Sequence, residues 1–234
     1  MKIAIMQPYV FPYLGYFQLI HAVDTFVFYD DVHFKKKGFI NRNSILLNDK
    51  SMMFTIPCKG ISQNKLIKDI ELKFDTKERL KFLSKIKHCY SKSPYYKNVY
   101  KFLESFVLNS EAYFISEFAI ESIELITRYL ELNTTFKKSS EYYLKSQGME
   151  KTKRLIEISK SENAESYINP IGGKPLYSKA IFNQHGIDLY FLKSDSILYK
   201  QYDNKFVPDL SIIDLLMFNS VDEIKVYLNA YMLK

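Results

Sequence analysis

Residues 2–43 of the chain read KIAIMQPYVFPYLGYFQLIHAVDTFVFYDDVHFKKKGFINRN, and this stretch decides the fold. The apolar run at 2–6 predicts a buried strand, residues 13–23 carry apolar side chains at helical spacing, and 25–29 is rich in strand-forming residues. Strand, helix and strand in this order predict a right-handed βαβ unit. Ligands of open α/β sheets bind beyond the carboxyl ends of such strands, so the polar residues that follow each run are the first candidates for a site.

The next part of the chain changes from strand to helix. Residues 44–47 and 52–57 flank Asn48-Asp49-Lys50, which is typical of a β-hairpin, and the alternation over 66–74 is compatible with its extension. Amphipathic spacing then predicts three helices, over 76–90, 96–108 and 110–130. Residues 76–140 are therefore expected to form a helical insertion or lid.

The last part of the chain returns to alternating helix and strand. The pattern predicts helix, strand, helix, strand, helix and a closing segment, over residues 149–161, 166–169, 174–185, 187–192, 212–218 and 222–233. Because α/β alternation at both ends favours one sheet, we expect residues 1–234 to form a single α/β domain. It should have a Rossmann-like, mostly parallel sheet that contains both 2–6 and 187–192, with the hairpin and the helical insertion in the middle.

The composition is that of a basic globular protein. The 234 residues carry a net charge of +7, with 19 Tyr, 18 Phe and no Trp, and no apolar run is long enough to cross a bilayer. The N-terminal apolar run is too short for a secretory signal, and two cysteines form no disulfide or metal pattern, so we expect a cytoplasmic protein without a metal site. A basic surface suits phosphate-bearing ligands, whereas no nucleic-acid-binding module is recognisable.

Asp30, Asp31 and His33 follow the second predicted strand and are the candidate catalytic residues. Paired carboxylates beside an imidazole can take a proton from an amine or hydroxyl, because burial and neighbouring charge shift their pKa values toward neutrality. A solvated acidic turn, balanced by the lysines at 35–37, explains the same residues equally well. The spacing of one His and two Asp is not diagnostic of a metal site.

Polar residues near other predicted strand ends are candidates for substrate binding. Arg42 offers a planar fork for phosphate or carboxylate, although the Asn residues beside it also suit a turn. Two glycines precede Lys174, as in an anion-binding loop or an ordinary turn, and Asp214 interrupts an apolar helix, as a buried acceptor or a cleft residue. The predicted substrate-binding residues, most of them expected in one cleft with Asp30 and Asp31, are Gln7, Tyr9, Tyr13, Lys35, Asn41, Arg42, Asn43, Asn169, Lys174 and Asp214.

The chain resembles the WbqC-like family of bacterial proteins in six motifs. They are QPYVFPYLGYFQLI from residue 7, DTFVFYDDVHFKKKGFINRN from 24, TIPC from 55, YINPIGG from 167, YKQ from 199 and FVPDLSIIDLL from 206. The motifs are spread from the N-terminus to the last helix, and the N-terminal block is the most specific. His33 stands where the family pattern has Gln, which favours Asp30 and Asp31 over His33 as proton acceptors.

Members of this family occur in gene clusters for O-antigen and other surface polysaccharides. The resemblance therefore implies a role in making or modifying a nucleotide-linked sugar. We favour N-acylation, including aminoacylation such as glycylation, of a nucleotide-linked amino sugar. The donor would be an acyl thioester, which an acyl carrier could deliver, or an ATP-derived acyl group. A glycosyltransferase and a non-catalytic scaffold protein of the same pathway are the alternatives.

Overall fold

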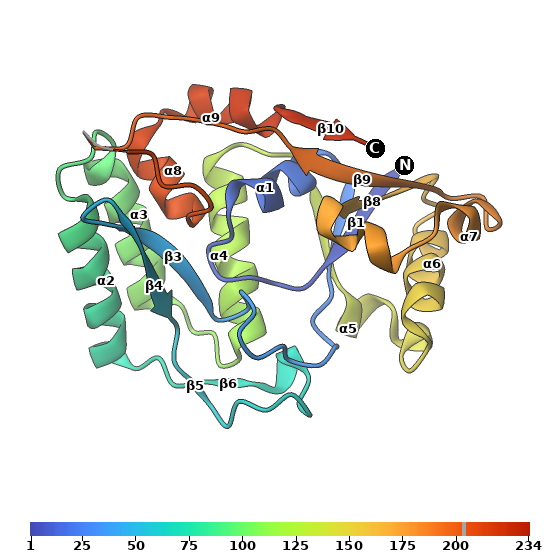
Figure 1. Ribbon diagram of the computed structural model, residues 1–234. Helices are drawn as coiled ribbons and strands as arrows, with labels where there is room; N and C mark the ends of the chain where they lie inside the picture. Colours follow the sequence, from blue (N-terminus) through green and yellow to red (C-terminus); the bar gives the residue numbers. More distant parts are fainter. Residues whose placement is uncertain (203–204) are drawn as a thin grey trace.

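A six-stranded sheet forms the centre of the computed structural model, which describes residues 1–202 and 205–234 (Figure 1). The strand order is β10-β9-β8-β1-β2-β7, with bounds Tyr231–Leu233, Asp188–Ser194, Ser166–Pro170, Lys2–Met6, Thr25–Phe28 and Thr135–Lys138. Neighbouring strands are parallel except β10, which runs antiparallel to β9 at one edge. The expected mostly parallel α/β sheet is confirmed, and it holds both the first strand and the strand predicted over 187–192.

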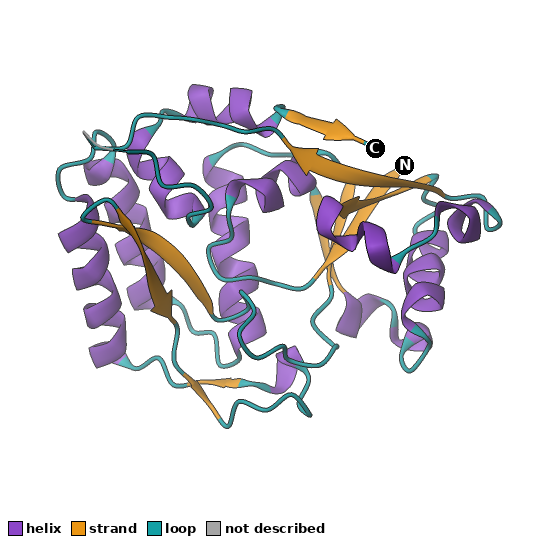
Figure 2. Ribbon diagram, in the orientation of Figure 1, coloured by secondary structure: helices purple, strands orange, loops and turns teal. Residues whose placement is uncertain are grey.

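Helices cover both faces of this sheet (Figure 2). In the described ranges the α-helices are Leu14–His21 (α1), Thr76–Tyr90 (α2), Tyr96–Asn109 (α3), Ile115–Tyr129 (α4), Ser139–Tyr142 (α5), Lys151–Ser161 (α6), Lys179–Asn183 (α7), Ile212–Phe218 (α8) and Val221–Leu228 (α9). The helix predicted over 174–185 is shorter than expected. Its first residues belong to a 3₁₀ turn, Ile171–Leu176 (η3), where Pro175 has no N–H to donate to an α-helix.

Side chains alternate along each strand and build two cores, one on each face of the sheet. In β1, Ile3 and Ile5 belong to one core and Ala4 belongs to the other. In β2, Val27 belongs to the core of Ile3 and Ile5, and Phe26 to the core of Ala4. The core that contains Ile3 and Ile5 packs against α6 and α7, and the other packs against α1, α4, α8 and α9. The molecule therefore has three layers, helix, sheet and helix.

A β-hairpin follows the first βαβ unit, as predicted. Its strands are Arg42–Leu47 (β3) and Lys50–Thr55 (β4), and Asn48 and Asp49 at the turn have φ values of 47° and 57°. Such left-handed pairs are the turn residues that match the twist of a two-residue hairpin. The expected extension over 66–74 is wrong, because the chain turns through Ile67–Asp69 (η1), and Glu71–Leu72 (β6) pairs with Cys58–Lys59 (β5) instead.

The helical segment after the hairpins extends the core on one face of the sheet, with α2 against α3 and β3, and α3 against α8. Phe82 of α2, Leu103 of α3 and Phe118 of α4 belong to the same buried cluster as Phe26 of β2. The range expected to be helical, 76–140, also contains β7, an edge strand of the central sheet. The sequence TFKK gave no sign of this strand, because it is short and half polar.

The order of the strands creates a topological switch point between β1 and β8. From β1 the chain passes through α1 to β2, and β7 lies beyond β2 on the same side. It then returns through α6 to β8, on the other side of β1, and continues to β9. Loops that follow the two strands diverge at such a point and leave a crevice, which is where ligands of open α/β sheets bind.

Candidate functional site

A cavity of about 1040 Å³ opens at the carboxyl ends of β1, β2 and β8, at this switch point. Small-molecule sites range over about 300–1,000 Å³, so the cavity is at the upper end of that range. Seven of the predicted site residues line it, namely Gln7, Tyr9, Tyr13, Asp31, His33, Lys35 and Asn169. Its walls also contain polar and aromatic residues that were not among the predicted site residues, including Tyr29, Lys68, Gln147, Lys151, Arg154 and Tyr177.

The loop after β1 supplies amide and phenol groups to the cavity. The Gln7 carbonyl accepts a hydrogen bond from the Tyr16 hydroxyl at 2.9 Å, which fixes the start of the loop. The ring of Tyr13 lies against Gly15, where an added Cβ would be 2.7 Å from Cε2, so a larger residue here would displace the ring. Burial, with Tyr13 beside it, raises the pKa of Tyr9 to about 12, so the Tyr9 hydroxyl keeps its proton and can donate to a ligand.

Phe11 holds the same loop in a strained conformation. Its φ is 41°, a value that few residues other than glycine adopt. The Phe11 N–H donates to Ser122 Oγ at 3.3 Å, and its carbonyl accepts from Asn43 Nδ2 and Ser211 Oγ, both at 2.7 Å. Asn43, predicted to bind substrate, is therefore buried behind the loop, where it positions the loop and does not line the cavity.

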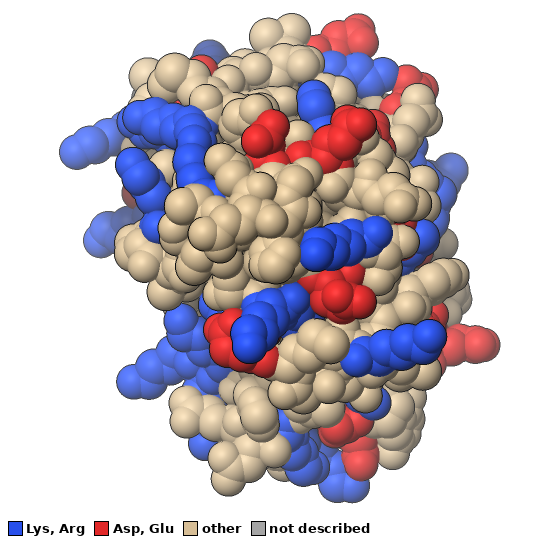
Figure 3. Space-filling view, turned by 90° about the vertical axis from the view of Figure 1, so that its right-hand side faces the viewer, with Lys and Arg blue, Asp and Glu red and all other residues tan. Residues whose placement is uncertain are grey.

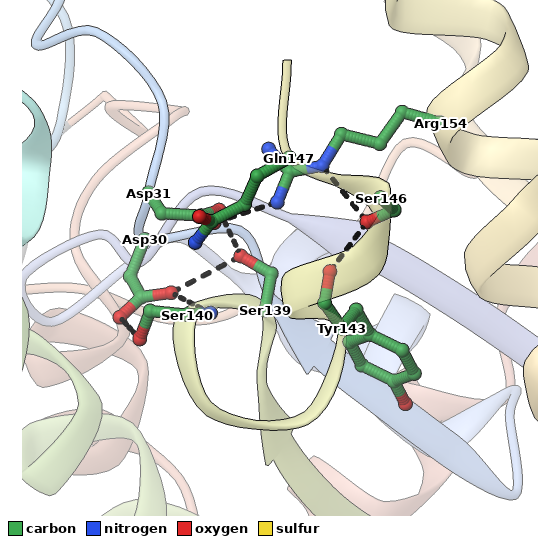
Figure 4. Close-up of polar contacts among 8 residues, drawn as sticks. All are labelled: Asp30, Asp31, Ser139, Ser140, Tyr143, Ser146, Gln147 and Arg154. Atoms are coloured by element: carbon green, nitrogen blue, oxygen red, sulfur yellow. Dashed lines mark hydrogen bonds and ion pairs between the residues drawn. The ribbon is translucent and has the colours of Figure 1, made fainter. Parts of the chain in front are cut away.

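Asp31 anchors a buried hydrogen-bond network at the end of β2 (Figure 4). One carboxylate oxygen accepts from Ser139 Oγ at 2.5 Å, and the other accepts from Gln147 Nε2 at 3.0 Å and Arg154 Nη2 at 2.6 Å. Burial would raise the pKa of Asp31, but the hydrogen bonds from Arg154 and Ser139 outweigh burial and leave the pKa below its ordinary value. Asp31 is consequently a stable carboxylate and a weak proton acceptor.

Asp30 shares Ser139 with Asp31, but the remaining hydrogen bonds to its carboxylate come from Ser140 instead of Gln147 and Arg154. Its two oxygens accept from the Ser140 N–H at 3.0 Å, Ser140 Oγ at 2.6 Å and Ser139 Oγ at 3.1 Å. These bonds attach the end of β2 to the first turn of α5 (Figure 4). Asp30 is 3% exposed and is not among the described residues that line the cavity.

Four more predicted substrate-binding residues lie away from the cavity. Asn41 Nδ2 donates to the Ile56 carbonyl at 3.0 Å, Arg42 Nε donates to the Gly38 carbonyl at 2.9 Å, and Lys174 is exposed outside the lining. Asp214 is completely buried. It accepts from the Tyr90 hydroxyl at 2.9 Å, the Tyr199 hydroxyl at 2.6 Å and Gln201 Nε2 at 2.9 Å, which makes it an internal hydrogen-bond acceptor.

The end of β8 forms the opposite wall. Asn169 Nδ2 lies 2.7 Å from the hydroxyl of Tyr167, and that ring stacks on Phe182 of α7. A Cβ at Gly173 would overlap Asn169 Oδ1, so the second glycine of the predicted loop accommodates the Asn169 side chain in this position. Asn169 therefore reaches the cavity because the glycine behind it leaves room.

The cavity has a net positive lining. Lys35, Lys68 and Lys151 line it, and the charge of Arg154 is balanced by Asp31 at 2.6 Å. Basic side chains also lie across the outer face that carries α6 and α7, interspersed with acidic ones rather than gathered in one block (Figure 3). In the part of the chain that the structure describes, no three His, Cys, Asp or Glu side chains are grouped so as to hold a metal ion, and no helix is long and apolar enough to cross a membrane.

Arg154, which lines the cavity, was not among the predicted site residues. The buried stripe of α6 contains Leu155 and Ile158, and Arg154 is 4% exposed in line with Ile158, four residues further on. Its spacing could have indicated burial, because Arg154 lies four residues before an apolar core residue, and residues four apart share one helix face. The partner, Asp31, is 123 residues away in sequence.

The low pKa of Asp31 predicts how stability depends on pH. Because the folded state lowers this pKa, the unfolded chain takes up the proton first as the pH falls, and folding loses stability. The contribution is complete above the ordinary Asp pKa of about 3.9 and is lost as the pH falls through the lower folded value. Urea unfolding between pH 6 and pH 3 should give a steeper loss of stability for the wild type than for Asp31→Asn, and equal slopes would contradict this assignment.

Comparison with known proteins agrees with the resemblance of the motifs. The chain is 28% identical over 231 residues to the uncharacterized protein Rv1507c of Mycobacterium tuberculosis, and the alignment covers 97% of each chain. No solved structure gives a significant match. The sequence pattern of the WbqC-like protein family matches residues 7–226. This match includes both loops that build the cavity, and the chain belongs to the WbqC-like protein family.

Proposed function

We propose that this protein is an enzyme of bacterial surface-polysaccharide synthesis that acylates a nucleotide-linked amino sugar in the cavity between β1 and β8. The observation that supports the proposal is the lining of that cavity, where lysines and tyrosines surround a volume of about 1040 Å³. Cations suit a diphosphate, and phenol rings can stack on a sugar or base while their hydroxyls donate hydrogen bonds. The place of the cavity, at the switch point of the sheet, is where such folds bind nucleotides.

In this reaction the sugar amine attacks the carbonyl carbon of the acyl donor. A C–N bond forms, the bond from the acyl carbon to a thioester sulfur or to an acyl-adenylate oxygen breaks, and the amine gives up one proton. An aminoacyl group such as glycyl would be transferred in the same way. Phe39, Met149 and Leu176 line the cavity with 46%, 42% and 61% of their surface exposed, which supports a less polar donor beside the sugar nucleotide.

His33 is the group that best suits acceptance of the amine proton. It is exposed, lines the cavity, and its ring makes no hydrogen bond to any described residue. Both oxygens of Asp31 are already hydrogen-bonded, and Asp30 is held by Ser139 and Ser140 outside the cavity. We therefore assign proton acceptance to His33, and to Asp31 a positioning role that acts through Arg154 and Gln147.

Mass spectrometry of nucleotide-linked amino sugars incubated with the protein, ATP, glycine and acyl thioesters tests the proposed reaction. A gain in mass on the intact sugar nucleotide is expected with one of the donors. Release of free nucleoside diphosphate would favour a glycosyltransferase instead, because N-acylation leaves the sugar–phosphate bond intact. No change in mass, together with no binding in calorimetry at low salt, would remove the enzymatic proposal and favour a scaffold protein.

The same assay tests the role of His33. His33→Gln should lower turnover about 100-fold or more, the usual contribution of general acid–base catalysis, while substrate affinity stays within about twofold. His88→Gln is the matched control, because His88 is exposed on α2 and does not line the cavity. Full turnover in His33→Gln would show that the Gln of the family pattern serves equally well and that His33 is not the proton acceptor.

A further inference from the structure

Arg154 is the most buried cation of the cavity lining, and its hydrogen bonds to Asp31 and Ser146 hold the guanidinium at two of its three nitrogens. Nη2 donates to Asp31 at 2.6 Å and Nε donates to Ser146 Oγ at 3.2 Å, and neither contact uses Nη1. The ring of Tyr29 covers one side of the guanidinium, with Cζ 4.7 Å from the ring centroid. The side chain is therefore fixed in position before any ligand arrives, and it lines the cavity.

Lys151 lies one turn earlier on the same face of α6. It also lines the cavity, and its Nζ is 5.0 Å from the centroid of the Tyr177 ring, which is another lining residue. The two cations are three residues apart, so they project from neighbouring positions of the helix. An exposed ammonium beside a rigid guanidinium matches a ligand that carries more than one negative oxygen.

We propose that Arg154 Nη1 and Lys151 Nζ form the subsite for the phosphoryl groups of a nucleoside diphosphate. This inference deepens and rests on the proposed function, since it places the diphosphate of the sugar nucleotide against α6. Asp31 pairs with Nη2 of the guanidinium, so one of the two positive charges is balanced and the other remains for the ligand. The candidates chosen from sequence, Arg42 and Lys174, do not line the cavity and take no part in this subsite.

The subsite requires donors at specific positions. Removing a lysine that lines the cavity should therefore weaken binding more than removing a lysine elsewhere on α6, although both changes lower the net charge equally. Lys151→Ala removes the exposed ammonium without disturbing a buried partner. Lys153→Ala is the matched control, because Lys153 is exposed on the same helix and does not line the cavity. Arg154→Lys keeps the charge but loses the planar fork.

Calorimetric titration with inorganic pyrophosphate at low salt tests the subsite without any turnover. We expect wild type to bind, Lys151→Ala and Arg154→Lys to bind about tenfold or more weakly, as for loss of one charge-assisted hydrogen bond, and Lys153→Ala to stay within about twofold. The binding result for Arg154→Lys is interpreted only if thermal unfolding of this variant remains cooperative. Otherwise the comparison of Lys151→Ala with Lys153→Ala tests the subsite. No binding of pyrophosphate, or equal weakening by Lys151→Ala and Lys153→Ala, would overturn the subsite.

The outcome for the subsite can be separated from the outcome for the proposed function. Pyrophosphate that binds through Lys151, with no sugar nucleotide ever modified, would leave the subsite in place and remove the acylation reaction. If the sugar nucleotide is modified and its KM is the same for wild type, Lys151→Ala and Lys153→Ala, the reaction is supported and the subsite is refuted.

Discussion

Replacing Arg154 by methionine should lower the free energy of unfolding by about 3–5 kcal/mol, because it leaves the Asp31 carboxylate buried without its cation. The pair is internal, with 5% and 1% of the two side chains exposed, and the atoms in contact are 2.6 Å apart. In a domain of this size about 1 kcal/mol corresponds to about 2–4 °C, so the thermal midpoint should fall by roughly 6–20 °C. Urea unfolding at neutral pH measures the effect.

A double-mutant cycle separates the pair from the packing of the long Arg154 side chain. Asp31→Asn combined with Arg154→Met removes both charges, so the double variant should lose much less stability than the sum of the two single variants, with a coupling energy of about 2 kcal/mol or more. Lys153→Met serves as control for the new methionine on the same helix, because Lys153 is exposed. Additive losses would mean that the contact does not join α6 to the end of β2.

Replacing Asp214 by alanine should destabilise the protein by about 3 kcal/mol or more, because buried donors left without an acceptor cost about 1–3 kcal/mol each. Asp214 accepts from the side chains of Tyr90, Tyr199 and Gln201. The Tyr90 hydroxyl also accepts from the Leu46 N–H at 2.9 Å, so the carboxylate connects α8, α2, β3 and the segment before α8. Chemical unfolding measures the loss.

Two further variants show that the effect comes from the buried acceptor. Asp214→Asn keeps one oxygen that can accept, and should lose less stability than Asp214→Ala. Asp195→Ala removes a carboxylate that is exposed on the surface and should change stability by less than about 0.5 kcal/mol. Burial raises the pKa of Asp214, while the hydrogen bonds from Tyr199, Gln201 and Tyr90 act to lower it. A loss in Asp214→Ala no greater than in Asp195→Ala would refute this role.

The sequence by itself determined the parallel sheet and the edge at which the cavity forms. Short apolar runs rich in strand-forming residues predicted the central strands, and the carboxyl ends of parallel strands meet at one edge. Gln7, Asp31 and Asn169 follow or end three such strands, so their place at the cavity was readable from local pattern alone. For the polar residues next to them in sequence, the pattern predicted a position at the same edge but not whether the side chain faces the cavity.

The tertiary structure alone decided which polar groups face the cavity and which hold the fold together. Asp30 and Asp31 are adjacent and chemically identical, yet the Asp30 carboxylate accepts from Ser139 and Ser140 of α5, whereas that of Asp31 accepts from Ser139 and also pairs with Arg154. Asn43 and Asp214 also became internal acceptors or donors, because their partners come from segments that are distant in sequence. A polar residue takes its role from the groups that desolvate and hydrogen-bond it, and sequence spacing does not specify those groups before the helices have packed.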